Sequence, residues 1–321
     1  MRLRALAAAS EPLVEAAARE HLDGGGAALG AVLAGFFAAA GASSGVLLGP
    51  ISVLVVGTGQ GARAFDGRAR QPGLGLKRPR GVPEHEPVPE AAYVAAPTAI
   101  AAAIVAHAYG GGQSLRAVVR PGIQAAEKSS APARAALLER VAQVGAAALL
   151  EGSYRRPLLR VGALSEGGLV SPSDLDAPAE IDVPAVELDH GGERWLAPLW
   201  ASAQVELSPG LGRGAGVVAI DTQGVLAALT YRADPAGVWI EEHQLLAPLL
   251  AVPVRRGVPR VAPGARLPAP AALAVRLDDG ARPVEVALWP EASGLVLGDA
   301  ATSRLRLRRD PATRLVASDR R

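Results

Sequence analysis

The chain has 321 residues, which is enough for one large domain or two smaller ones. Half of the residues are apolar but only 3% are aromatic, so we expect a large core of closely packed small side chains. Cysteine is absent, which excludes disulfides, thiolate metal sites and a cysteine nucleophile, and fits a cytoplasmic protein. The formal charge of +2 gives no general reason to expect nucleic-acid binding.

No charged residue occurs between Gly24 and Ala62, so a membrane span has to be considered there. Glycines and the pair Ser43-Ser44 interrupt this segment. Its uninterrupted apolar part is therefore shorter than the roughly 20 residues that a bilayer requires. We expect a buried, alanine-rich helix instead, with no membrane association and no targeting segment.

Apolar periodicity predicts the main elements along the chain. Helices are expected over residues 11–22, 24–40, 99–108 and 134–150. Strands are expected near residues 51–66, 217–231 and 271–317. His21 lies near the end of the first helix, where a cation interacts favourably with the helix dipole. Residues 73–90 are rich in proline, glycine and charge, and predict a surface loop.

Three groups of charged residues invite a functional interpretation, and each has a simpler one. Arginine alternates with leucine from Arg304 to Arg308, which favours a strand with leucine inside over a nucleic-acid-binding tail. His107 has no Asp, Glu or His three or four residues away, so we do not expect it to bind a metal. Glu241, Glu242 and His243 favour a solvated turn over a metal or acid–base site. No cofactor is expected.

The segment from Ser208 to Thr230 reads SPGLGRGAGVVAIDTQGVLAALT and predicts two strands joined by a turn at Asp221–Gly224. It resembles the strand-turn-strand that opens the catalytic half of γ-glutamyltransferases, which are N-terminal-nucleophile hydrolases. The motif of that family is T-T-H-x-S-V-V-D-x-x-G-N-A-V-S. Asp221 and Gly224 fall on its Asp and Gly. Gly214 stands where the family has its nucleophilic threonine.

Other segments carry the same resemblance. Residues 65–72 (FDGRARQP) are similar to L-D-x-R-E-x-A-P, which puts Arg68 on the arginine that grips the α-carboxylate of the glutamyl group. A structural ion pair is the other interpretation of Arg68. Residues 167–175 resemble G-G-x-(L/I)-(T/S)-x-x-D-L, and there Ser171 and Asp174 also predict a helix cap. Residues 316–321 resemble the closing A-S-D-P-R.

The resemblance implies an α+β fold, a four-layer αββα sandwich with two sheets face to face. Helices 11–40 and 96–150 would form the outer layers. The chain would be a single domain, 1–321, with a part like the large subunit, 1–208, and a truncated part like the small subunit, 209–321.

Several parts of the family's site are replaced. Besides Gly214, the paired serines of the family correspond to Ala269-Pro270, and its oxyanion turn corresponds to residues 290–294. We therefore expect a protein that does not cleave itself, a binding or scaffold protein without catalysis. It would pair with a second copy or an active relative, or hold a small amino-acid-like ligand. The alternative is a γ-glutamyl transferase, hydrolase or amidohydrolase with an altered site, in which Arg68 holds a carboxylate.

Overall fold

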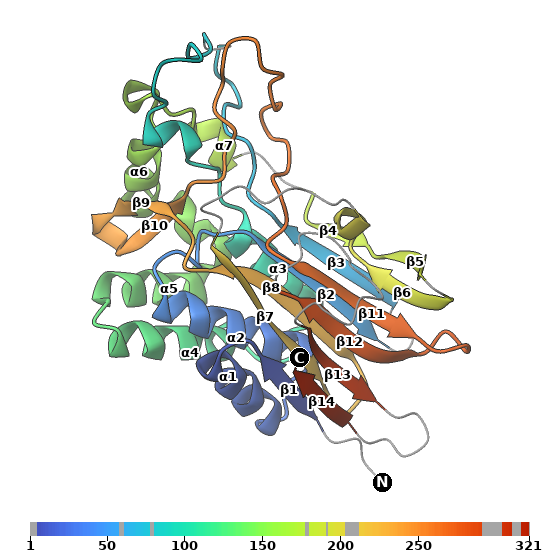
Figure 1. Ribbon diagram of the computed structural model, residues 1–321. Coiled ribbons are helices and arrows are strands. Elements are labelled where there is room, and N and C mark those ends of the chain that lie inside the picture. Colours follow the sequence, from blue (N-terminus) through green and yellow to red (C-terminus); the bar gives the residue numbers. More distant parts are fainter. Residues whose placement is uncertain are drawn as a thin grey trace.

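Figure 1 shows the computed structural model of the chain, which describes residues 5–57, 61–77, 80–176, 180–190, 192–202, 212–290, 304–309 and 316–320. Over these residues the fold is α+β. Two antiparallel sheets of six strands pack face to face, and helices cover the outer face of one sheet (Figure 1).

The first sheet combines strands from the beginning and from the middle of the described sequence. In spatial order it contains β1 (Leu6–Ala9), β7 (Arg213–Ile220), β8 (Leu226–Ala233), β2 (Ile51–Gly57), β3 (Gly61–Gly67) and β4 (Asp182–Pro184). The hairpins β2–β3 and β7–β8 are those expected from the sequence. They lie side by side, because β2 pairs with β8.

The second sheet lies against the first. Its strands, in spatial order, are β14 (Val316–Arg320), β13 (Leu305–Arg309), β12 (Pro283–Trp289), β11 (Ala272–Leu277), β6 (Glu193–Ala197) and β5 (Val186–His190). Side chains alternate between the two faces of a strand, so every second residue points into the space between the sheets. This inner core contains Leu54, Val218 and Ala228 from the first sheet and Val275, Leu288 and Leu307 from the second. The alternation of Leu305 and Leu307 with exposed or half-buried arginines confirms the strand predicted there.

The helices are α1 (Pro12–Asp23), α2 (Ala28–Ala42), α3 (Ala99–Gly110), α4 (Leu115–Lys128), α5 (Pro132–Val144), α6 (Gly152–Val161) and α7 (Pro172–Asp176). Short 3-10 turns cover Glu90–Tyr93, Gly145–Leu150, Leu164–Glu166, Leu199–Ser202 and Glu241–His243. A two-stranded sheet of β9 (Gly237–Ile240) and β10 (Leu245–Pro248) lies beside α6 at one end (Figure 1).

Helices α1 to α5 all lie on the side of the first sheet (Figure 1), so the described residues form three layers: helices, sheet and sheet. This differs from the expectation that segments 11–40 and 96–150 would lie outside both sheets. Helix α2 lies inside the helical layer and is buried along nearly its whole length. A helix that is apolar on all sides needs cover on both sides. The first sheet covers one side of α2, and α4 covers the other.

Two glycines allow α2 and α4 to pack closely. A Cβ atom at Gly41 would lie 1.9 Å from the carbonyl oxygen of Gly122, and one at Gly122 would lie 2.4 Å from the carbonyl oxygen of Phe37. The backbones therefore touch at this crossing, as expected for a core of small residues.

Three local expectations need correction. Helix α4 was not predicted, because Pro121 lies inside it and proline disfavours a helix interior. The helix expected over 134–150 ends at Val144, since Gly145 has a φ of 66°, and continues as a 3-10 turn. His21 lies in the last turn of α1, as expected, but it is buried, which does not favour the cation expected there. In the described part of the chain, no helix is both long enough and apolar enough to cross a bilayer.

Candidate functional site

Gly214, at the position of the expected nucleophile, lies near the start of β7 and pairs with Arg232 of β8. Side chains alternate along a strand, so residue 214 faces the same side of β7 as Val218, which belongs to the inner core. A side chain at residue 214 would therefore point toward the second sheet. A Cβ atom there would lie 1.7 Å from the carbonyl oxygen of Pro290 and 2.7 Å from the carbonyl carbon. No side chain fits at residue 214 unless the backbone moves.

Pro290 follows β12 directly. It is the first residue of segment 290–294, which was expected to replace the oxyanion turn of the family. The structure brings it against Gly214, although residues 291–294 lie outside the described part. The group that Pro290 presents is a carbonyl, which accepts hydrogen bonds. An oxyanion needs donors.

The next position on the same face is also closed. A Cβ atom at Gly216 would lie 2.5 Å from the carbonyl oxygen of Leu229 and 2.9 Å from Cδ2 of Leu288 in the second sheet. The start of β7 therefore packs directly against its neighbours on this face.

The nearby hydroxyl groups are engaged in hydrogen bonds. Thr230 is fully buried, and its Oγ1 donates to the carbonyl oxygen of Ala271 at 3.3 Å. Ser52 is paired with Thr230 across β2 and β8, and its Oγ accepts a bond of 3.1 Å from Nε1 of Trp200. Ser208, the hydroxyl nearest upstream in the sequence, lies outside the described residues.

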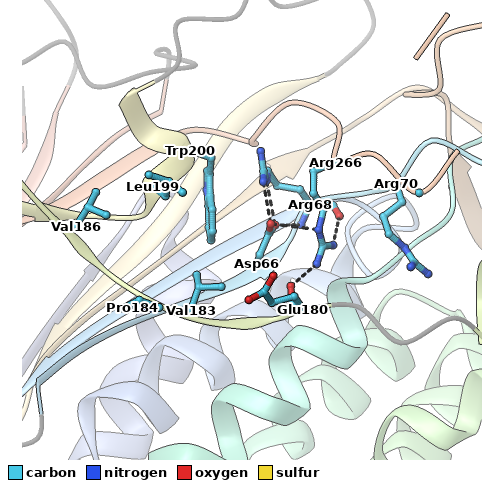
Figure 2. A pocket seen from close by; sticks show the side chains of 11 residues that line it. Asp66, Arg68, Arg70, Glu180, Val183, Pro184, Val186, Leu199, Trp200 and Arg266 are labelled. Atoms are coloured by element: carbon cyan, nitrogen blue, oxygen red, sulfur yellow. Dashed lines mark hydrogen bonds and ion pairs between the residues drawn. The ribbon is translucent and has the colours of Figure 1, made fainter. Parts of the chain in front are cut away.

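Arg68 lies just after β3, in the wall of a cavity of about 550 Å³. Figure 2 shows that wall, which consists of Asp66, Arg68, Arg70, Glu180, Val183, Pro184, Val186, Leu199, Trp200, Gly264 and Arg266. Gly214 is not among these residues. The cavity therefore has a charged side with three arginines and two carboxylates, and an apolar side from β4, β5 and the 199–202 turn.

Within the cavity wall, Arg68 is held by Asp66. Its Nε donates to Oδ1 of Asp66 at 3.0 Å and its Nη2 to Oδ2 at 2.8 Å. These two parallel bonds are the bidentate geometry that also suits a ligand carboxylate. The guanidinium lies 4.7 Å from the ring centroid of Trp200, within the range of a cation–π contact. Arg68 thus has the structural ion pair foreseen for it, on the surface of an open cavity.

Arg266 is a cavity residue that sequence reasoning missed. Its Nε lies 3.2 Å from Oδ2 of Asp66, and its Nη1 donates to the carbonyl oxygen of Arg68 at 3.0 Å. Burial lowers the pKa of Arg266, and the carboxylate of Asp66 partly opposes that shift. The available signal was its place three residues before Ala269-Pro270, which correspond to the paired serines of the family that the sequence resembles.

Arg70 is the third arginine of the wall and is buried. Its Nη2 donates to the carbonyl oxygen of Asp174 at 2.5 Å. Burial lowers its pKa, and Asp174 acts in the opposite direction. Arg70 therefore connects the cavity to the α7 cap.

The two tryptophans of segment 195–200 have different surroundings. Trp195 is buried on the outer face of the second sheet, with its ring 5.8 Å from that of Trp289. Trp200 lines the cavity (Figure 2). Only Trp200 is placed to contact a ligand in the cavity. An exposed tryptophan occurs instead at Trp239 of β9.

Two matches to the family have structural roles. Oδ1 of Asp221 accepts from the backbone N–H groups of Gln223 and Val225 in the predicted turn, and Oδ2 accepts from that of Ala28 at the start of α2. Ser171 and Asp174 form the predicted cap, because each side chain accepts from the backbone N–H of the other residue.

The groups considered for metal binding lie apart or have other partners. Nε2 of His107 is 2.8 Å from the carbonyl oxygen of Gln113. Glu242 pairs with Arg160, which lowers the pKa of Glu242 to about 2, and His243 is buried against Tyr154. Over the described residues, His, Asp and Glu nowhere form a group of three that could hold a metal ion.

Comparison with known proteins identifies the fold and not the family. No protein-family model matches the sequence, and a search of curated proteins found no significant match. Among solved structures, cephalosporin acylase from Bacillus halodurans is similar with a TM-score of 0.79 and 13% identity, over 99% of this chain and 94% of that one. LmbA2991HD gives a TM-score of 0.67 and 13% identity, over 99% and 96%. γ-Glutamyltranspeptidase from Pseudomonas nitroreducens gives 0.49 and 19%, over 60% and 70%.

The chain therefore shares its α+β fold with the cephalosporin acylase structure. At an identity of 13% this likeness concerns the fold alone.

Proposed function

We propose that this chain is a binding protein that does not cleave itself and does not catalyse amide transfer. The observation that carries the proposal is the contact between Gly214 and Pro290, since the Cβ position at residue 214 is 1.7 Å from a carbonyl oxygen. In the N-terminal-nucleophile hydrolases that the sequence resembles, the nucleophile is a threonine, serine or cysteine whose own freed amine acts as the base. Gly214 supplies no attacking atom, and its surroundings leave no room for one.

The cavity beside Arg68 supports a binding role. With three arginines against Asp66 and Glu180, its wall has a net positive charge. A small acid, such as an amino-acid-like ligand, matches that charge, and its apolar part would lie toward Trp200 and Leu199. We propose this class of ligand for the cavity. We also propose that the chain is related to the γ-glutamyltransferases, because Arg68 falls on the arginine with which that family holds a carboxylate.

Mass spectrometry and an activity assay test the loss of catalysis. We expect the purified protein to be a single uncut chain and to release no product from a γ-glutamyl amide. Gly214→Thr should not restore either property, because the added side chain meets Pro290. Turnover that disappears when one hydroxyl residue is replaced would instead support the hydrolase with an altered site.

Calorimetry tests the cavity. We expect glutamate or glutathione to bind, and Arg68→Gln to weaken binding at least tenfold through loss of a charged contact, about 1.4 kcal/mol or more. Arg63→Gln is the matched control, because Arg63 lies in β3, the strand that Arg68 directly follows, and does not line the cavity. Equal affinities for the wild type and both variants would exclude Arg68 from binding.

A further inference from the structure

Only a small part of the positive charge in the Arg68 cavity is available to a ligand. All three side-chain nitrogens of Arg266 have partners in the chain, because Nε lies 3.2 Å from Oδ2 of Asp66, Nη1 donates to the carbonyl oxygen of Arg68, and Nη2 donates to that of Glu180 at 2.7 Å. Asp66 also accepts from Nε and Nη2 of Arg68. Nη1 of Arg68 has no hydrogen-bond partner in the described part of the chain and is not a buried atom. This nitrogen offers a ligand one contact, which suits a single carboxylate.

The other wall of the cavity is apolar. Val183 and Pro184 belong to β4, Val186 belongs to β5, and Leu199 and Trp200 lie in the turn after β6. Leu199 is 64% exposed, although it is a large apolar side chain. A ligand that covers this wall with apolar groups removes apolar surface from water, which favours binding.

Trp200 is fixed between the charged and the apolar wall. Its Nε1 donates to Oγ of Ser52 at 3.1 Å, and the guanidinium of Arg68 lies 4.7 Å from the centroid of its ring. In Figure 2 the ring stands between the charged side chains of Asp66 and Arg68 and the side chain of Leu199. A side chain that is already held in place loses little freedom when a ligand binds. The apolar wall therefore begins directly beside the contact that Arg68 offers.

We infer that the ligand of this cavity is an acid with one carboxylate and an apolar body, such as an aliphatic acid of medium length. The carboxylate would accept from Nη1 of Arg68, and the body would cover Trp200 and Leu199. The inference rests on the proposed binding function and narrows its ligand class. The cavity volume of about 550 Å³ lies within the range of about 300–1,000 Å³ that is usual for ligand pockets.

Glutamate is a poorer match than such an acid. Its second carboxylate would lose water against the apolar wall without gaining a partner there. Its ammonium group could reach only Glu180, the other carboxylate of the wall, and that side chain is exposed. Exposed ion pairs contribute little to affinity. We therefore expect glutamate to bind, but more weakly than an apolar acid.

Calorimetry of the whole chain with butanoate, hexanoate and octanoate tests the inference. A methylene group that is fully removed from water raises the affinity about fourfold. Because the cavity is open, we expect a rise of about twofold to fourfold for each methylene. Hexanoate should also bind more tightly than norleucine, which adds an ammonium group to the same carbon chain, and more tightly than adipate, which adds a second carboxylate.

Three variants locate the binding. Leu199→Ser should reduce the gain for each methylene, whereas Arg68→Gln should weaken the three aliphatic acids by a similar factor and leave that gain unchanged. Leu164→Ser is the matched control, because Leu164 is a leucine of similar exposure, 61%, that does not line the cavity. It should behave as the wild type.

The outcomes separate this inference from the proposed function. If glutamate or norleucine bound more tightly than hexanoate, or if chain length had no effect, the inference would be overturned, while binding that still required Arg68 would keep the proposed function. An equal gain for each methylene in Leu199→Ser and the wild type would overturn the inference as well. Binding of hexanoate without binding of glutamate would support it. If none of these acids bound, both the inference and the proposed acid site would fail.

Discussion

At the scale of single residues, the proposed loss of catalysis depends on Gly214. The absence of a hydroxyl there is visible in the sequence, but the reason that none fits is not. That reason is the carbonyl of Pro290, which follows a strand of the other sheet and comes close to Gly214 only when the chain folds. If only the nucleophile were missing, another residue of a rearranged site could take its place. Because no side chain fits at residue 214, we propose that this chain uses the fold for binding and not for catalysis.

Gly214→Ala tests the closure. Because the new Cβ would overlap the carbonyl of Pro290, the sheets must shift, and we expect a loss of about 1–3 kcal/mol or more in the free energy of unfolding. Urea denaturation measures it. Gly152→Ala in α6 is the control, since its Cβ would meet nothing nearer than Nε of Arg156 at 3.7 Å. Two variants of equal stability would show that residue 214 has room.

His21 is a second residue whose surroundings reverse a prediction. Cβ atoms at Gly26 and Gly30 would lie 2.2 and 2.3 Å from its Nε2, so the ring occupies space that the two glycines leave free. Burial, and next the positive charge of His107, lower the pKa of His21. The ring is therefore held neutral, whereas its place at a helix end predicted a stabilising cation.

Stability should consequently fall below neutral pH. His21 takes up a proton in the unfolded chain near pH 6.5 but only at lower pH in the folded chain, so the unfolded state binds more protons. As the pH falls below that value, the free energy of unfolding decreases by up to about 1.4 kcal/mol per pH unit. Denaturation in urea at several pH values measures the slope.

In His21→Gln the slope should be smaller, and in His85→Gln, at an exposed loop residue, it should stay as in the wild type. An unchanged slope in His21→Gln would show that other groups cause the acid sensitivity.

At the scale of elements, α2 and α4 explain why the core is built from alanine and glycine. The contact of Gly122 with Phe37 brings the two helices together at backbone distance. Close packing of this kind gains dispersion energy over the whole crossing. It also makes each glycine irreplaceable, although neither has a positive φ.

Gly122→Ala should separate the helices. The added methyl would lie 2.4 Å from the carbonyl oxygen of Phe37, and we expect a cost of about 1–3 kcal/mol. Thermal denaturation compares it with Gly110→Ala at the end of α3, where the new Cβ would be 3.7 Å from Leu29. If Gly110→Ala were the more damaging change, the crossing would not be as close as described.

Elements with strong local patterns could be predicted, and those set by distant partners could not. The hairpin around Asp221 has two apolar runs with a turn residue and a glycine between them, so its strands and turn follow from local rules. Helix α4 could not be predicted, because it contains Pro121, which has a poor helix propensity. Packing of α4 against α2 outweighs that propensity. Arg68 could be assigned to a site by its likeness to a motif. Its partner Arg266 is 198 residues away, and no local pattern connects them.

At the scale of the molecule, the layers define where function can lie. Helices cover one face of the first sheet, and its other face meets the second sheet (Figure 1). In the described residues, the cavity with Arg68 opens beyond the end of β3, while the start of β7 is packed shut. The cavity proposed for binding and the position proposed for the missing nucleophile are thus formed by different residues.

The integrity of the chain tests the central claim most directly. Intact mass spectrometry of protein purified without protease treatment, and kept for long periods at neutral pH, reports every cut. We predict one species that contains all 321 residues. Two fragments divided immediately before Gly214 would mean that the chain processes itself as an active N-terminal-nucleophile hydrolase does, and would contradict the account.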